Sequence, residues 1–121
     1  MQWQAGARDP EHIDPEQALA DQLVLDLPGR AEYMKALLWD YQNNPPQYPT
    51  WQAWLRRRQP KLLAIWGAND PFFIPAGATA YTTDVPGAVV QLLDTGHFAL
   101  EEEADAIADA SSALLSTAFG G

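Results

Sequence analysis

The fold of this chain is decided by one short stretch, KLLAIWGAND, at residues 61–70. It opens with an apolar run bounded by Pro60 and Gly67, a pattern typical of a strand buried on both faces of a parallel sheet. A second run of this kind, AVVQLLD, covers residues 88–94. The segment between the two runs, PAGATAYTTDV at residues 75–85, has the length of a short helix. A strand, a helix and a strand in this order predict a parallel pair joined by a right-handed crossover.

The last segment of the chain is predicted to be a helix from about residue 101 onward. Apolar side chains recur there at helical spacing in a polar and acidic background, at Ala104, Ile107, Ala108, Leu114, Leu115 and Ala118. The acidic residues at 101–103 fall in its first turn, where the helix dipole favours negative charge. We therefore expect the second half of the chain to have the order β-α-β-α.

The first half of the chain has the pattern of helices separated by prolines. Asp14 can cap a helix whose first position is Pro15, and this helix is predicted to reach about residue 21. A second helix is expected from Pro28 to the paired Asn and Pro residues at 43–46, because its apolar residues recur at steps of three and four.

A third helix is expected over residues 50–59. Trp51, Trp54 and Leu55 share one side of it, and three arginines at 56–58 lie at its C-terminal end, where cations favour the helix dipole. These arginines are either a solvated helix end or a site for an anion.

The change of pattern at residue 60 predicts two parts, a helical region at 1–59 and a β-α-β-α region at 60–121. With 121 residues and 47% apolar content, the chain can form one modest globular domain with its own core. The predicted fold class is therefore α/β, with a helical first part.

The composition argues against several classes of function. Acidic residues outnumber basic residues 16 to 7, and the net charge of −9 disfavours nucleic acid and anionic membrane surfaces as partners. The chain has no cysteine, and its two histidines, His12 and His97, lie far apart in sequence, so we expect no metal site and no cofactor. No apolar run approaches the roughly 20 residues that cross a bilayer, and the N-terminal residues do not resemble a signal peptide. A cytoplasmic location is expected.

Two residues that can carry acid and base chemistry follow the two predicted strands. Asp70 lies in the loop after the first strand and His97 in the loop after the second. Because the carboxyl ends of neighbouring parallel strands meet at one edge of the sheet, we expect these side chains to be neighbours. A carboxylate beside imidazole fixes its tautomer and leaves the other ring nitrogen to take or give a proton. The alternative is that Asp70 only starts a turn before Pro71 and His97 only caps the next helix.

The two loops and their surroundings resemble a known family. The sequences WGANDPFFIPAGATAY, at residues 66–81, and DTGHFALEEEADAI, at 94–107, resemble the C-terminal end of an α/β-hydrolase, in the branch of epoxide hydrolases and haloalkane dehalogenases. The resemblance implies that Asp70 is the catalytic acid and His97 the catalytic histidine. It also implies that residues 1–59 are a helical cap over the active site.

Four aromatic residues are candidates for contact with a small apolar substrate. Phe72 and Phe98 flank the predicted acid and histidine, and Trp39 and Trp51 lie in the cap-like region. Each of them could equally serve ordinary core packing.

The chain departs from the family in one respect. An α/β-hydrolase carries its nucleophile on a G-x-S-x-G elbow, or one with Asp in place of Ser, and no two glycines here have that spacing. The only serines, Ser111, Ser112 and Ser116, lie in the predicted terminal helix. We therefore expect the nucleophile, Asp or Ser, and the oxyanion-hole loop to lie outside this chain, and the chain alone to be inactive.

Two functions remain open on the sequence. The chain is either a hydrolase part, which hydrolyses an epoxide, haloalkane or ester through a covalent intermediate once completed, or a non-catalytic module. Two strands leave sheet edges that invite pairing with another chain, so the second hypothesis predicts a homo-oligomer.

Overall fold

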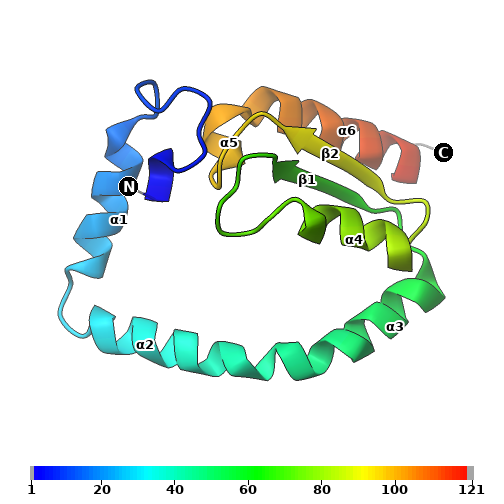
Figure 1. Cartoon of the computed structure of the whole chain (residues 1–121), viewed down its shortest axis with the longest axis horizontal. Coiled ribbons are helices and arrows are strands. Elements are labelled where there is room, and N and C mark those ends of the chain that lie inside the picture. Colours follow the sequence, from blue (N-terminus) through cyan, green and yellow to red (C-terminus); the bar gives the residue numbers. More distant parts are fainter. Residues whose placement is uncertain (1, 120–121) are drawn as a thin grey trace. The chain divides into compact units, whose positions relative to one another are not determined.

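The computed structural model describes residues 2–119. The chain divides into two compact units, one formed by residues 2–13 and 55–119 and the other by Asp14–Trp54. The elements follow one another in the order η1 (Gln2–Gln4), α1 (Pro15–Leu25), α2 (Arg30–Asp40), η2 (Tyr41–Asn43), η3 (Pro45–Gln47), α3 (Tyr48–Arg58), β1 (Leu63–Gly67), α4 (Ala76–Asp84), β2 (Val89–Leu93), α5 (Ala99–Glu102) and α6 (Ala104–Phe119) (Figure 1). This is a mixed α/β structure, rich in helix.

The sheet of the first unit consists of β1 and β2, which pair in parallel with Leu63 opposite Val89 and Gly67 opposite Leu93. Helix α4 connects the strands and lies against both of them, and α6 lies against β1. The predicted parallel pair with an intervening helix is therefore confirmed. Parallel pairing brings the loop after β1 and the loop after β2 to the same edge of the sheet.

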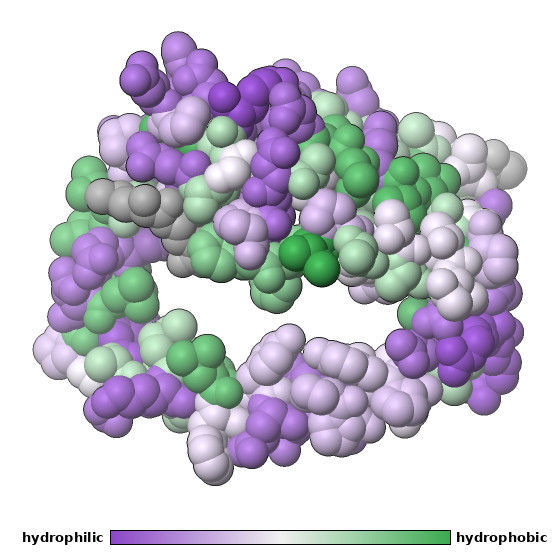
Figure 2. All heavy atoms as spheres, viewed as in Figure 1, coloured by the Kyte–Doolittle hydropathy of each residue, from purple (hydrophilic) through white to green (hydrophobic). Residues whose placement is uncertain are grey.

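The prediction that both strands are buried on both faces is wrong for this chain. In β1 only Ala64 and Gly67 are buried, while in β2 the side chains of Val89 and Leu92 are 52% and 46% exposed. The reason is that residues 2–119 form only two strands. Within this range no further strands flank β1 and β2, and α4 and α6 leave part of the two strands exposed. Figure 2 shows apolar residues at the surface over α6, which belongs to the same unit.

The end of α3 is fixed to the end of α4 by polar contacts within this unit. Arg56 Nη1 donates to Asp84 Oδ1 at 2.6 Å, and Gln59 Nε2 donates to the carbonyl of Asp84 at 2.8 Å. Gln59 has a φ of 45°, the left-handed conformation that ends the helix before β1. Of the three arginines at this helix end, one thus has a carboxylate partner.

The unit Asp14–Trp54 contains α1, α2 and most of α3. Asp14 caps α1 as predicted, since its Oδ1 accepts the N–H of Glu16 at 2.9 Å. The helix continues to Leu25, beyond the predicted end near residue 21, and ends shortly before Pro28. The segment after α2 forms two short 3-10 turns rather than an open loop, and no residue of α1 or α2 is buried.

Candidate active site

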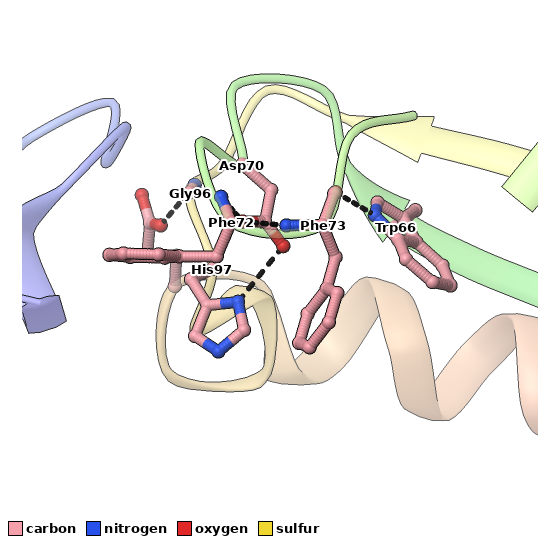
Figure 3. Close-up of polar contacts among 7 residues, drawn as sticks. Trp66, Asp70, Phe72, Phe73, Gly96 and His97 are labelled. Atoms are coloured by element: carbon pink, nitrogen blue, oxygen red, sulfur yellow. Dashed lines mark hydrogen bonds and ion pairs between the residues drawn. The ribbon is translucent and has the colours of Figure 1, made fainter. Parts of the chain in front are cut away.

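The side chains of Asp70 and His97 meet at the edge where both strands end. Asp70 lies in the loop that follows β1 and His97 in the loop that follows β2, and His97 Nδ1 lies 2.9 Å from Asp70 Oδ2 (Figure 3). The predicted contact between these two residues is confirmed. Their side chains are 5% and 19% exposed, so the contact is largely shielded from water.

The carboxylate of Asp70 uses both of its oxygens. Oδ2 faces His97, and Oδ1 accepts the backbone N–H groups of Phe72 at 2.8 Å and Phe73 at 3.0 Å. Asp70 therefore starts the turn before Pro71 and also pairs with the imidazole, so the two interpretations of this residue hold together. Burial raises the pKa of Asp70, but the hydrogen bonds from His97, Phe73 and Phe72 lower it by more than burial raises it. The pKa of Asp70 therefore lies below that of an ordinary aspartate.

The contact with Asp70 sets the orientation of the His97 imidazole. An ionised Asp70 can only accept, so it favours the tautomer with the proton on Nδ1. In Figure 3 the other ring nitrogen points away from Asp70, and Nε2 has no hydrogen-bond partner within residues 2–119. A basic nitrogen that is held in place and unengaged is what a general base needs.

Aromatic rings surround the imidazole. The ring centroids of Phe72, Phe73 and Phe98 lie 5.2, 5.3 and 5.0 Å from that of His97. Phe98 is itself stacked on Trp3, with centroids 3.7 Å apart. The two phenylalanines predicted beside the acid and base are therefore there, and the structure adds Phe73 and Trp3.

Hydrogen bonds link the loop after β1 to its strand and to the loop after β2. Trp66 Nε1, on β1, donates to the carbonyl of Phe73 at 2.6 Å, across the turn that contains Asp70. Asn69 donates through its side chain to Asp94 Oδ1 at 2.8 Å and through its backbone N–H to the carbonyl of Thr95 at 3.0 Å. These contacts fix the spacing between the acid and the histidine.

Three glycines allow the backbone segments of the site to approach one another. A Cβ on Gly67 would collide with the carbonyl of Gly96, and a Cβ on Gly96 would collide with the carbonyl of Ala5. Gly6 has a φ of 79°, and a Cβ there would collide with the carbonyl of Asn69. The N-terminal residues therefore pack directly on the two loops that carry Asp70 and His97.

Sequence reasoning missed the carboxylate that supports this packing. Glu102 Oε1 accepts the N–H of Gly96 and its Oε2 accepts the N–H of Arg8, each at 2.9 Å. A helix does start near His97 as predicted, because α5 begins at Ala99 and holds Glu101 and Glu102 in its first turn. The prediction of one continuous helix is wrong, because the helix is interrupted at Glu103 and α6 begins at Ala104. The three consecutive glutamates pointed to a helix start but not to a contact with residues near the N-terminus.

The remaining predicted substrate residues, Trp39 and Trp51, lie in the unit Asp14–Trp54. Their side chains are 75% and 48% exposed. Contact of these two residues with a substrate stays a prediction.

The part of the chain that the structure describes contains no group of three or more His, Asp or Glu side chains arranged to hold a metal ion. His12 Nδ1 lies 2.7 Å from Asp9 Oδ2 at the surface. Among residues 2–119, none of the helices has the length and apolar character needed to cross a membrane.

The fold and the site together describe a mixed α/β protein with an aspartate and histidine pair at the carboxyl ends of two parallel strands. Over 108 residues, 89% of its length, the chain is 41% identical to a Saccharomyces cerevisiae protein named "Uncharacterized hydrolase YNR064C". The chain spans 37% of the length of that relative. No protein-family model matches the chain, and no solved structure matches it.

Proposed function

We propose that this chain is the acid, base and cap portion of an α/β-hydrolase in the branch of epoxide hydrolases and haloalkane dehalogenases. The observation that carries the proposal is the contact of His97 Nδ1 with Asp70 Oδ2 at the carboxyl ends of adjacent parallel strands. The motifs around both residues and the identity to a protein named as a hydrolase support it. In this proposal residues 60–121 carry the pair, and the helices of Asp14–Trp54 form the cap.

The proposed reaction is hydrolysis of a covalent ester between the enzyme and its substrate. His97 Nε2 takes a proton from water, and the resulting hydroxide adds to the carbonyl carbon of the ester. The bond from that carbon to the departing oxygen then breaks, and the imidazolium returns the proton to this oxygen. Asp70 stays ionised throughout and stabilises the positive charge on His97.

The nucleophile of this proposal lies outside the 121 residues, because no elbow motif is present among them. The proposed substrate is small and apolar, because the rings of Phe72, Phe73 and Phe98 surround the imidazole. Phenylalanine side chains offer contact area to such a substrate and no hydrogen-bonding group. Trp39 and Trp51 are proposed as substrate-contacting residues of the cap.

The test uses the longest reading frame that contains these residues, purified and assayed with a nitrophenyl ester, an aryl epoxide and a haloalkane. His97→Ala should lower turnover by about a hundred- to ten-thousandfold, because it removes the general base. It should also let the covalent intermediate accumulate, visible by mass spectrometry as the protein plus the substrate fragment. His12→Ala is the matched control, because His12 also pairs with an aspartate but is 84% exposed. Equal losses in both variants, or none in either, would contradict the proposal.

A second candidate function is a non-catalytic module that associates with a second copy of itself. It is favoured by the exposure of Val89 and Leu92 on β2 and by a hollow of about 370 Å³ between the strands and α6. The hollow is lined by Leu63, Val89, Gln91, Ala110, Ala113, Leu114 and Thr117. Light scattering at high micromolar concentration should then report a dimer that Val89→Lys dissociates, and a strict monomer would exclude this function.

A further inference from the structure

We propose that Glu102 is a positioning residue for His97, an inference that deepens the proposed function and rests on it. Glu102 makes no hydrogen bond to the imidazole. It accepts a hydrogen bond from the backbone N–H of Gly96, the residue directly before His97, and so holds the backbone that carries the imidazole.

The carboxylate of Glu102 is divided between two backbone donors that are far apart in sequence. Oε1 accepts from Gly96 and Oε2 accepts from Arg8, both at 2.9 Å. Hydrogen bonds to an ionised acceptor are about twice as strong as neutral ones. One side chain therefore fixes the backbone of the His97 loop relative to the N-terminal segment that packs on it.

Neighbouring contacts keep this arrangement in one geometry. Arg8 Nη2 forms an ion pair with Glu103 Oε1 at 2.6 Å, so side chain and backbone of Arg8 are both held by consecutive glutamates. Gly96 has no room for a side chain, because a Cβ would collide with the carbonyl of Ala5. Loss of the Glu102 carboxylate would free the Gly96 backbone to rotate, and the ring of His97 would then turn relative to Asp70.

The neighbouring Glu101 provides the matched control. It lies on the same short helix, carries the same charge and is exposed, and its carboxylate makes no hydrogen bond within residues 2–119. Glu101→Gln changes the charge and the helix dipole interaction as Glu102→Gln does. Only the Glu102 variant leaves a single side-chain oxygen for two backbone N–H groups, so that one of them loses its acceptor.

The experiment is NMR of the full 121-residue chain in the wild type, Glu102→Ala, Glu102→Gln and Glu101→Gln. In the wild type, the ring ¹⁵N shifts should report Nδ1 protonated and a slowly exchanging Nδ1 proton. In Glu102→Ala this proton signal should broaden or vanish, and amide exchange of Gly96 should become about ten- to a hundredfold faster. In Glu102→Gln the one remaining oxygen can serve only one of the two N–H groups, so amide exchange should become faster at Gly96 or at Arg8. Glu101→Gln should match the wild type in both measurements.

Different results separate the positioning role from simpler ones. A Glu102→Ala variant that melts at lower temperature but keeps the His97 signals of the wild type would overturn the proposal and leave the proposed function intact. A wild type without the Nδ1 proton signal would instead contradict the pairing with Asp70, and with it the proposed function. If Glu102→Ala does not fold, Glu102→Leu decides the outcome, because it keeps the approximate size of the side chain and has no acceptor.

Discussion

The indole N–H of Trp66 donates to the carbonyl of Phe73 at 2.6 Å and closes the turn that presents Asp70. Trp66→Phe removes this donor and keeps an aromatic ring on β1. The free energy of unfolding should fall by about 1 kcal/mol, the net value of a typical hydrogen bond. Urea unfolding measures the change, and Trp54→Phe on the exposed side of α3 is the control. An unchanged stability of Trp66→Phe would mean that the turn is held by Asp70 alone.

The lowered pKa of Asp70 makes the free energy of unfolding depend on pH in the acidic range. An unfolded aspartate titrates near about pH 3.9, and the folded carboxyl titrates lower because its hydrogen bonds outweigh its burial. The stabilisation is therefore fully present above the unfolded pKa and is lost as the pH falls through the folded pKa.

Asp70→Asn should accordingly flatten the dependence of unfolding free energy on pH below about pH 4, relative to the wild type. The measurement is urea unfolding at a series of pH values, with Asp21→Asn on the exposed surface of α1 as control. Parallel curves for the wild type and Asp70→Asn would contradict the prediction.

Gly67 should not tolerate a side chain. The Cβ of Gly67→Ala would collide with the carbonyl of Gly96. The backbone fixes the positions of both groups, so no side-chain rotation can relieve the strain. A loss of about 1 to 3 kcal/mol in unfolding free energy is expected, as for overpacked cores. Gly87→Ala is the control, since no atom lies within 4 Å of that Cβ position. Equal stability of the two variants would show that the loops move apart readily.

The ion pair between Arg56 and Asp84 should contribute more than an exposed pair. The side chain of Asp84 is 11% exposed and that of Arg56 is 52% exposed, so water screens the pair only in part. A double-mutant cycle should give a coupling of about 1 kcal/mol, the upper part of the range for pairs at a surface. The pair of Glu32 and Lys35, exposed on both sides, should give less in the same experiment. The reverse order would rule out a role for Arg56 in joining α3 to α4.

The chain alone should not hydrolyse epoxides, haloalkanes or simple esters above a buffer control. The loss of a nucleophile removes on the order of a millionfold in rate from triad enzymes, and the remaining base acts only on an oriented substrate. Turnover that disappears in His97→Ala would show that a residue of this chain, such as Asp94, serves as nucleophile. Turnover that survives that substitution would point to a contaminating enzyme.

The parallel strands and the Asp70 and His97 contact could be predicted because their signals are local. Each strand is a short apolar run, and Asp70 and His97 each lie in the loop directly after one of them, so the parallel topology alone brings the two residues together. The cap of α1 by Asp14 is equally local, because the donor lies two residues away.

The hydrogen bonds of Glu102 that support the site could not be predicted, because long-range contacts of this kind produce no periodic pattern in the sequence. Glu102 and Arg8 are 94 residues apart, and nothing near either residue encodes the other. The burial of the strands was predicted wrongly for a related reason: an apolar run indicates what a strand can bury, whereas the number of neighbouring strands decides what it does bury.

The division of the chain into units has a consequence for evolution. Every contact described above between Asp70, His97 and their supporting residues lies within residues 2–13 and 55–119, while Asp14–Trp54 forms a compact unit of its own. The segment is thus an insert between the two stretches of that unit, and mutations in its helices alter none of the residues that make those contacts. Descendants of one ancestral gene could exchange this insert as a module while they inherit the same aspartate and histidine pair.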